Sequence, residues 1–443
     1  MAKNKLNLKK SHELFKKVIK VIPLASQTFS KSYLQFIKEE APLFATHAKG
    51  AEIWDVDGNK YTDMISSLLP VVLGYGYPAV DNAIKGQLKK GIIFSLSSPL
   101  EYELAKLLIK HIPSAEMVRF GKNGSDVTTG AIRVARAYTG RDYVAVCGYH
   151  GWHDWYIGST ARDLGVPKAT KDLTLKFSYN DIESLKKLFK DNPGKIAAVI
   201  MEPMNYVEPE KGFLEQVKEV THQNDALLVF DEVITGFRFS LGGAQKLFGV
   251  TPDLSTFGKS MANGMPISAL VGKRKYMETI DKIFYSFTQG GEALSIAAAI
   301  ATIKEMEKKK VINYIWEMGK ILQDGTNKLL KENGLDGFIK VEGKPCWQVF
   351  IINPVSGREG SQRPSATNGT ALEIKTYLQQ EILQAGFLWY GQHNMSFSHT
   401  KKDVDDLLSS YNKIFGQLKI LLAEKKLKEN IKGGLITDIF KLR

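Results

Sequence analysis

The sequence predicts an α/β fold in which a large domain with a central, mostly parallel sheet is joined by a smaller α+β domain. The length of 443 residues exceeds one minimal domain and suits one large and one smaller domain. Between about residues 80 and 300, short apolar runs alternate with helical periods, which is typical of an α/β sheet. The two ends of the chain differ, with a hairpin pattern near the start and long helical segments near the end.

The N-terminal part combines a helical segment with a β-hairpin. An amphipathic segment at the start of the chain ends at Pro23. The runs at 51–55 and 61–64 flank an Asp-Gly pair that begins at Asp57, and such a pair between two strands predicts a hairpin. We therefore expect residues 1–75 to contribute to the smaller domain.

The middle of the chain, residues 76–310, contains the expected strands and helices of the large domain. The expected strands are Met117–Phe120, Tyr143–Cys147, Ile196–Met201, Ala226–Phe230, Leu254–Phe257 and Ser268–Val271. The helical periods between them include Val127–Tyr138, Ile182–Lys190 and Leu214–Gln223. A long helical pattern over 312–330 then opens residues 311–443, which we expect to complete the smaller domain.

Several expected strands lead directly into polar or reactive residues. These residues are Tyr149 and His150, Glu202, Asp231 and Glu232, and Lys259. Open α/β sheets bind ligands outside the carboxyl ends of their strands. The sequence therefore predicts a shared pocket at that edge of the sheet.

Composition and charge exclude several classes of protein. The net charge is +13, but the lysines are spread over amphipathic segments without the clustered, aromatic-interleaved pattern of nucleic-acid binders, so we expect no nucleic-acid partner. No apolar stretch approaches the roughly 20 residues of a membrane-spanning helix, and no signal-peptide pattern follows the basic start, so we expect no membrane partner. Cys147 and Cys346 alone form no disulfide framework, which favours a reducing cytoplasm. The positive charge also favours anionic, phosphorylated small molecules.

A glycine-containing turn, Gly121–Ser125, stands between a short strand and a helix. Glycine lets backbone N–H groups approach an anion closely, a serine hydroxyl adds a donor, and the following helix contributes its positive end. Asn123, Gly124 and Ser125 are therefore a candidate phosphate cup. An ordinary strand-to-helix turn has the same appearance, and this motif alone does not separate the two.

Asp231 ends a strand that we expect to be buried, where a carboxylate is costly unless it is paired. Its partner could be Mg²⁺, as in a nucleotide-hydrolysing enzyme, or a protonated ring nitrogen such as that of pyridoxal 5′-phosphate (PLP). The sequence around Lys259 superficially resembles the end of a GxxxxGK[ST] phosphate loop, but Asp253 stands where that pattern needs glycine. The ring nitrogen is therefore the better partner.

Lys259 follows an expected strand, in a turn rich in glycine and serine and bounded by Pro266. A lone lysine at such a place is usually a surface residue. Here it lies beside the candidate cup and the buried acid, where desolvation and a nearby cationic ring would keep part of the amine neutral and nucleophilic. We therefore predict that Lys259 forms a Schiff base with PLP.

Five motifs in the same order resemble those of the class III aminotransferases, and within them the glutamate-1-semialdehyde aminomutase type. The motifs are GKNGSDVTTGAIRVARAYTGRD, GYHGWHDW, MEP, FDEVITGFR and PDLSTFGKSMANGMPISALVG. Their order and spacing agree over about residues 20–300. The resemblance implies the fold type I architecture of PLP-dependent transferases, small-molecule substrates, and usually a homodimer with sites at the subunit interface.

The resemblance also implies a role for each matching residue. Lys259 would hold the cofactor and move a proton between substrate and cofactor, and Asp231 would pair with the pyridinium nitrogen. The other implied contacts are Val233 and Tyr149 on the two ring faces, Asn123, Gly124 and Ser125 at the phosphate, Thr288 lent by the neighbouring subunit, and Glu202 at the substrate.

Departures from the aminomutase pattern lie around the substrate or the interface. Lys31 stands at the place of the arginine that grips the substrate carboxylate, and lysine lacks the bidentate fork of arginine. Ser125-Asp126 replaces a Thr-Glu pair, and Glu292-Ala293 replaces an Asn-Pro pair. These changes leave the cofactor residues intact and put glutamate-1-semialdehyde in doubt as the substrate.

We therefore expect an aminotransferase that moves an amino group from a donor such as glutamate to a polar, anionic or sugar-like carbonyl compound. The alternative is a 2,1-aminomutase, which returns the amino group to the same molecule, and a third hypothesis is a nucleotide-binding ATPase. His150 and His153 are three residues apart, but no third ligand accompanies them, so we expect no metal site.

Overall fold

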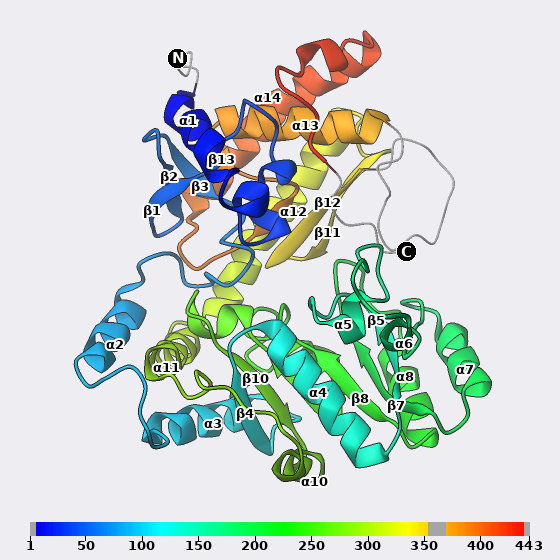
Figure 1. Cartoon of the computed structure of the whole chain (residues 1–443). Coiled ribbons are helices and arrows are strands. Elements are labelled where there is room, and N and C mark those ends of the chain that lie inside the picture. The colour runs from blue at the N-terminus through cyan, green and yellow to red at the C-terminus, as the bar shows by residue number, and fades with distance from the viewer. Residues whose placement is uncertain (1–5, 353–368, 438–443) are drawn as a thin grey trace. The chain divides into compact units, whose positions relative to one another are not determined.

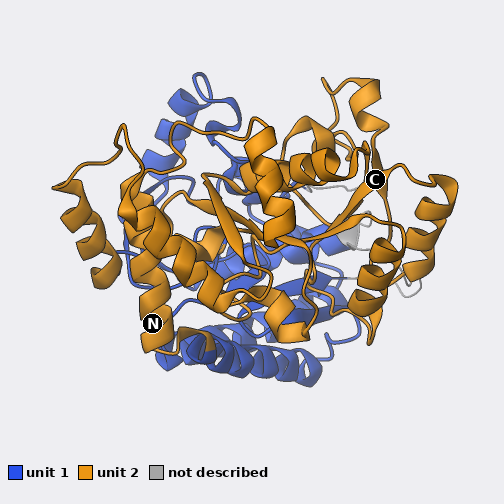
Figure 2. Ribbon diagram, turned by 90° about the horizontal axis from the view of Figure 1, so that it is seen from below, with its two compact units in different colours: residues 1–68, 72–77, 313–441 blue, residues 69–71, 78–312, 442–443 orange. Residues whose placement is uncertain are grey.

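The computed structural model describes residues 6–352 and 369–437 (Figure 1). Residues 1–5 of the predicted N-terminal segment, and residues 353–368 and 438–443 of the predicted C-terminal domain, lie outside the described residues. The chain forms two compact units, which Figure 2 colours separately. The described residues of unit 1 fall within 1–68, 72–77 and 313–441, and those of unit 2 within 69–71 and 78–312. Because a compact unit is not thereby an independently folding one, the predicted domain boundaries stay a prediction.

Unit 2 is built on a seven-stranded sheet with the strand order β4-β10-β9-β8-β7-β5-β6. Neighbouring strands are parallel except at β10, which runs antiparallel to both β4 and β9. The strands are β4 (Met117–Gly121), β5 (Tyr143–Cys147), β6 (Thr174–Lys176), β7 (Ile196–Met201), β8 (Leu227–Asp231), β9 (Leu254–Phe257) and β10 (Ser268–Gly272). The predicted α/β fold with a mostly parallel sheet is confirmed.

Alternate side chains of the strands pack into two hydrophobic clusters. In β8, Leu227 and Val229 belong to one cluster, whereas Leu228 and Phe230 belong to the other. Successive side chains of a strand point to opposite faces, so the clusters lie on opposite faces of the sheet. The first cluster includes residues of α4, and the second includes residues of α7 and α8. Burial on both faces explains why these strands are continuous apolar runs in the sequence.

The helices of unit 2 connect and cover these strands. They are α2 (Pro78–Leu88), α3 (Pro99–His111), α4 (Gly124–Thr139), α5 (Asp154–Ile157), α6 (Lys168–Lys171), α7 (Ile182–Asp191), α8 (Phe213–Gln223), α9 (Gly243–Phe248), α10 (Arg274–Met277) and α11 (Ala293–Lys308), with 3₁₀ turns η4 (Lys259–Ala262) and η5 (Glu278–Lys282).

Helix α4 begins earlier than the apolar periodicity predicted. The Asp126 carboxylate accepts hydrogen bonds from the backbone N–H groups of Lys122 and Asn123, at 2.9 and 2.7 Å, which fixes the chain at the helix start. At the other end, Gly140 adopts the left-handed conformation (φ 67°) that commonly terminates helices. The first turn escaped the apolar periodicity because Gly124, Ser125 and Asp126 carry no apolar side chain.

Unit 1 contains a four-stranded sheet, β1-β2-β3-β13, and a three-stranded sheet, β11-β12-β14. Its strands are β1 (Ala45–Lys49), β2 (Glu52–Asp55), β3 (Lys60–Asp63), β11 (Ile339–Lys344), β12 (Trp347–Ile352), β13 (Phe387–Leu388) and β14 (Gln392–Asn394). The antiparallel pairing of β2 with β3 confirms the predicted hairpin.

The helices of unit 1 come from both parts of the chain. They are α1 (Lys9–Val18), α12 (Val311–Glu332, which starts in unit 2), α13 (Gly369–Gln384) and α14 (Lys401–Ala423), with 3₁₀ turns η1 (Pro23–Ala25), η2 (Phe29–Lys31), η3 (Tyr33–Gln35) and η6 (Lys428–Asn430). In the described part of the chain, no helix has the length and apolar character needed to cross a membrane.

Candidate active site

The carboxyl ends of the parallel strands gather most of the predicted site residues at one edge of the sheet in unit 2. Strands β5, β7, β8 and β9 pair in parallel, so the residues that follow them lie along the same edge. Strand β4 ends at that edge too, because Gly121 pairs with Ser268 at the start of the antiparallel β10. Topology therefore places the segments that follow β4, β5, β7, β8 and β9 beside one another.

Lys259 begins η4 directly after β9. Burial lowers the pKa of its amine below the ordinary value of 10.5; Asp231 and Glu202 oppose this shift, and Arg238 adds to it. Within the described residues, no side chain forms a hydrogen bond or ion pair with this amine. A partly buried amine with a lowered pKa and no side-chain partner is suited to act as a nucleophile.

The turn that carries Lys259 is anchored through one backbone carbonyl. The Leu69 carbonyl oxygen accepts hydrogen bonds from Ser260 Oγ at 3.1 Å and from Arg238 Nη2 at 2.8 Å. Arg238 and Ser260 are both fully buried. Since Ser260 directly follows Lys259, this contact fixes the backbone from which the reactive amine projects.

Asp231 lies at the end of β8 and is 5% exposed. Its Oδ1 accepts hydrogen bonds from the Val233 N–H and from Thr256 Oγ1, both at 3.2 Å. Its Oδ2 lies 2.9 Å from His150 Nδ1. The carboxylate is therefore held by the segment after β8, by β9 and by the segment after β5.

His150 makes a contact that the sequence analysis did not predict. Its Nε2 lies 3.2 Å from the Cys147 carbonyl oxygen, and its Nδ1 lies 2.9 Å from Asp231 Oδ2. The ring therefore bridges the end of β5 and the carboxylate at the end of β8. A buried charged group needs such a hydrogen-bonded partner.

Glu202 follows β7 and is nearly buried. Its Oε2 accepts hydrogen bonds from the Tyr149 N–H at 3.0 Å and from Asn205 Nδ2 at 3.1 Å. Burial, and secondarily the charge of Asp231, raises the pKa of the Glu202 carboxyl above its ordinary value. The structure therefore shows that Glu202 holds the backbone of Tyr149.

Tyr149 is 40% exposed, and its ring packs edge-on against Tyr156, with ring centroids 5.7 Å apart. Burial, with the charges of Asp231 and Glu202, raises the pKa of its hydroxyl above the ordinary value of 10.0. The exposed side of the ring and the influence of both acids place Tyr149 at the same site as Asp231.

Two other polar residues near the site have structural contacts. Glu232 is fully buried and accepts hydrogen bonds from Thr235 Oγ1, from the N–H groups of Ala244 and Gln245, and from Gln245 Nε2. His153 Nδ1 lies 2.7 Å from Thr129 Oγ1. Within residues 6–352 and 369–437, no group of three or more His, Cys, Asp or Glu side chains is arranged to hold a metal ion.

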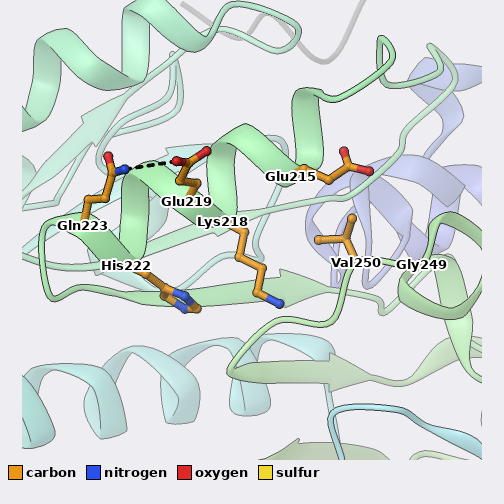
Figure 3. Close-up of a pocket in the computed structure, with 7 residues that line it drawn as sticks. All are labelled: Glu215, Lys218, Glu219, His222, Gln223, Gly249 and Val250. Carbon is orange, nitrogen blue, oxygen red and sulfur yellow. Dashed lines mark hydrogen bonds between the residues drawn. The ribbon is translucent and has the colours of Figure 1, made fainter.

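A surface hollow of about 580 Å³ along α8 is a separate feature (Figure 3). Among its lining residues, His222 Nε2 lies 2.8 Å from Asp253 Oδ2. Asp253 precedes β9, and α8 leads into β8, so this hollow lies toward the amino ends of these strands. It is therefore at the opposite edge of the sheet from Lys259 and contains none of the predicted site residues.

The sequence matches the family model described as Aminotransferase class-III over residues 35–346. A curated relative, the 3-aminobutyryl-CoA aminotransferase of Cloacimonas acidaminovorans (strain Evry), is 41% identical over 418 residues, which are 93% of this chain and 99% of the relative. The chain belongs to the class III aminotransferases. The family predicted from the sequence motifs is thus confirmed.

Solved structures of class III aminotransferases and related enzymes share the fold. The PLP internal aldimine form of the FumI protein of Sphingopyxis sp. MTA144 is 28% identical, with a TM-score of 0.84 and coverage of 94% of this chain and 98% of that chain. A glutamate-1-semialdehyde-aminomutase of Pseudomonas aeruginosa PAO1 is 22% identical, with a TM-score of 0.82 and coverage of 93% and 95%. The predicted fold type I architecture is confirmed.

Class III aminotransferases use PLP, and PLP is the cofactor of this enzyme. The described residues fit a phosphorylated ring aldehyde. A Cβ placed on Gly124 would lie 3.1 Å from Val233 Cγ1, and one placed on Gly258 would lie 3.4 Å from the same atom. Val233 therefore lies against both the candidate cup and the turn before Lys259, where it can cover one face of a ring.

The candidate phosphate cup opens at the N-terminus of α4. Asn123 is held there by Ser268 Oγ, which donates to its carbonyl oxygen at 2.8 Å. Ser125 Oγ accepts a hydrogen bond from the Trp152 N–H at 3.3 Å, so the cup also contacts the segment that carries Tyr149. Backbone N–H groups at a helix start, next to a serine hydroxyl, suit a phosphate group. The assignment of these residues to the phosphate stays a prediction.

For two predicted site residues, Lys31 and Thr288, no contact among the described residues of unit 2 links them to the sheet edge where Lys259 and Asp231 lie. Lys31 belongs to unit 1, where its Nζ donates a hydrogen bond to Ser67 Oγ at 3.1 Å. Burial lowers the pKa of the Lys31 amine, and Asp63 opposes that shift. Thr288 lies in an exposed turn before α11. Their predicted roles, at the substrate and at the phosphate of a neighbouring subunit, stay predictions.

Proposed function

We propose that this class III aminotransferase moves an amino group between glutamate and a 3-oxoacyl thioester of coenzyme A, with 3-aminobutyryl-CoA as the aminated partner. The observation that supports the proposal is the 41% identity to a 3-aminobutyryl-CoA aminotransferase, in an alignment that covers 99% of that relative's length. Glutamate as the donor follows from the sequence prediction. Such a thioester is an anionic carbonyl compound, which is the kind of substrate the basic sequence led us to expect.

Lys31 and the net charge support a thioester over a free amino acid. An arginine fork matches the two oxygens of a carboxylate, whereas a lysine offers a point charge. The carbonyl of a thioester is uncharged and needs no fork, and the phosphates of coenzyme A are attracted by a net charge of +13. The replacement of the expected arginine by Lys31 therefore suits this substrate class.

The cofactor supplies an aldehyde that condenses with amino groups and a ring that withdraws electrons from the substrate carbon. In our proposal, Lys259 binds the cofactor and moves a proton at the substrate carbon. Asp231, which His150 holds in place, pairs with the protonated ring nitrogen. The cup of Asn123, Gly124 and Ser125 binds the phosphate.

The remaining residues orient these groups. Tyr149 and Val233 hold the two faces of the ring, and Glu202 fixes Tyr149 through its backbone N–H. Through this bond Glu202 sets the position of Tyr149, and its predicted role at the substrate remains part of the proposal.

We further propose a cytoplasmic homodimer in which Thr288 reaches the phosphate of the second copy. Exposed apolar side chains support a partner surface near that turn: Phe284 is 83% exposed, and Ile92, whose carbonyl oxygen bonds the Ala293 N–H, is 45% exposed. Cys147 and Cys346 are free and buried, as suits a reducing compartment. Light scattering of the purified protein should give twice the monomer mass, and a monomer that is fully active would contradict the dimer.

The substrate proposal is tested with purified protein saturated with PLP. With glutamate and 3-oxobutyryl-CoA, mass spectrometry should detect 3-aminobutyryl-CoA, and 2-oxoglutarate should accumulate in equal amount. The matched control is 3-oxobutyrate without coenzyme A, which should react far more slowly. A preparation that holds PLP and turns over glutamate but never aminates the thioester would contradict the proposal. Isomerisation of glutamate-1-semialdehyde without any added acceptor would instead identify an aminomutase.

A further inference from the structure

The segment before α11 is clamped by cationic side chains of the β4–α4 region. Arg133 Nη1 donates to the Phe284 carbonyl oxygen at 2.6 Å, and Arg119 Nη2 donates to the Tyr285 carbonyl oxygen at 3.1 Å. Lys122 Nζ donates to Glu292 Oε2 at 3.0 Å. The Lys122 contact differs from the other two because it is an ion pair, and because Lys122 directly precedes the candidate phosphate cup.

Both members of the Lys122–Glu292 pair are largely shielded, with side chains 16% and 12% exposed. Glu292 also caps α11, since its carboxylate accepts hydrogen bonds from the Leu294 N–H at 2.6 Å and from Ser295 Oγ at 2.5 Å. Burial alone would raise the pKa of the Glu292 carboxyl, but hydrogen bonds from Ser295 and Lys122 outweigh it and hold the pKa below the ordinary value of 4.5. The carboxylate is therefore ionised at neutral pH.

The other end of the pair is equally fixed. The N–H groups of Lys122 and Asn123 both donate to Asp126, in the first turn of α4. The Asn123 carbonyl oxygen accepts from Ser268 Oγ. A change in the position of the Lys122 side chain is thus expected to shift the backbone that forms the cup.

We propose that Lys122 and Glu292 are positioning residues for the cofactor phosphate: their ion pair ties the cup of Asn123, Gly124 and Ser125 to the start of α11. Without the pair, the cup loses one of its fixed supports, and its N–H groups are less well oriented toward an anion. The inference requires PLP as the cofactor, and it is independent of the identity of the amino-group substrate.

The experiment measures the PLP dissociation constant of the cofactor-free protein by titration with PLP, followed by absorbance and fluorescence. Lys122→Met removes the amine and leaves the cap of α11 in place. Glu292→Asn removes the charge but keeps a side chain that caps helices well. Because a shielded ion pair contributes more than an exposed one, we expect each variant to bind PLP about five- to tenfold more weakly.

The double variant tests whether the two residues act through one another. If the two residues act through one another, Lys122→Met combined with Glu292→Asn binds PLP no more weakly than either single variant. Lys122→Arg, which keeps the charge, should restore affinity to within about twofold. The matched control is Lys273→Met, which breaks the Lys273–Asp253 ion pair (3.3 Å). Asp253 precedes β9 and Lys273 follows β10, so this pair lies at the edge of the sheet away from the cup, and its loss should leave PLP affinity unchanged.

Three results would overturn the proposal. Affinities of Lys122→Met and Glu292→Asn within twofold of the unaltered protein would show that the pair does not serve the cup. Additive losses in the double variant would show that the residues act separately. An equal loss in Lys273→Met would show a general effect of stability on cofactor binding, and unfolding midpoints of all variants, measured without PLP, provide that comparison directly.

Discussion

Replacement of His150 by phenylalanine tests the buried pair that holds Asp231. Phenylalanine keeps an aromatic ring beside Trp155 and Tyr156, whose ring centroids lie 6.5 and 5.1 Å from that of His150. It removes the Nδ1 atom that lies 2.9 Å from Asp231 Oδ2, in a pair whose side chains are 0% and 5% exposed. Removal of one member of a buried ion pair costs about 3–5 kcal/mol. The Asp231 carboxylate keeps its bonds to Val233 and Thr256, so we expect the lower end, about 3 kcal/mol.

The assay is urea unfolding of the cofactor-free protein, followed by tryptophan fluorescence and circular dichroism. His150→Phe is measured in the unaltered protein and again in Asp231→Asn, where no carboxylate remains to be left unpaired. The cost of the substitution should fall by at least about 2 kcal/mol in the Asp231→Asn background, which is the coupling expected of residues in direct contact. A cost below about 1 kcal/mol, or the same cost in both backgrounds, would refute the role of His150 in holding Asp231.

Three further predictions follow from single contacts. Gly151→Ala should weaken PLP binding at least about tenfold, because Gly151 has φ +102° and a Cβ there would lie 2.3 Å from Ser125 Oγ. The control is Gly165→Ala, which should bind PLP normally because Gly165 also has a positive φ (+88°) but has open space around it. Lys31→Met should raise the KM for the thioester about tenfold and leave the cofactor absorbance unchanged, whereas an altered spectrum would place Lys31 at the cofactor instead. In the cofactor-free protein, Lys259 should react with an amine-directed reagent at a lower pH than surface lysines, because burial disfavours its ammonium form; peptide mapping that finds it reactive only near pH 10.5 would contradict the lowered pKa.

The sheet of unit 2 was predictable because strands that are buried on both faces appear in the sequence as continuous apolar runs. Strands β5, β7 and β9 have the predicted bounds, and β8 is shifted by one residue to Leu227–Asp231. The reversed direction of β10 left no such record, because a buried strand is apolar whichever way it runs. The start of α4 was missed for the opposite reason, since its first turn is polar and lacks the apolar period.

The site was predictable where one residue type is chemically required. Lys259 and Asp231 could be proposed from the sequence because a lysine and an acid at the ends of buried strands are costly without a ligand. The contact of His150 with Asp231 could not be predicted, because the two residues lie 81 positions apart and only the fold brings them together. Glu232 directly follows Asp231 in the sequence, but its carboxylate accepts hydrogen bonds from the start of α9. A strand-end motif alone does not distinguish these different surroundings of the two acids. The pairing of Lys122 with Glu292 is likewise set by contacts across 170 positions of the chain.

The most direct test of the account is the site at which the cofactor is attached. Purified protein with bound PLP is reduced with borohydride, digested, and mapped by mass spectrometry, with Lys259→Ala treated in parallel. We expect the reduced cofactor on the peptide that contains Lys259 and no covalent cofactor in the variant. Attachment at another lysine, or a variant that still holds the cofactor covalently, would contradict the assignment of Lys259 as the residue that binds PLP.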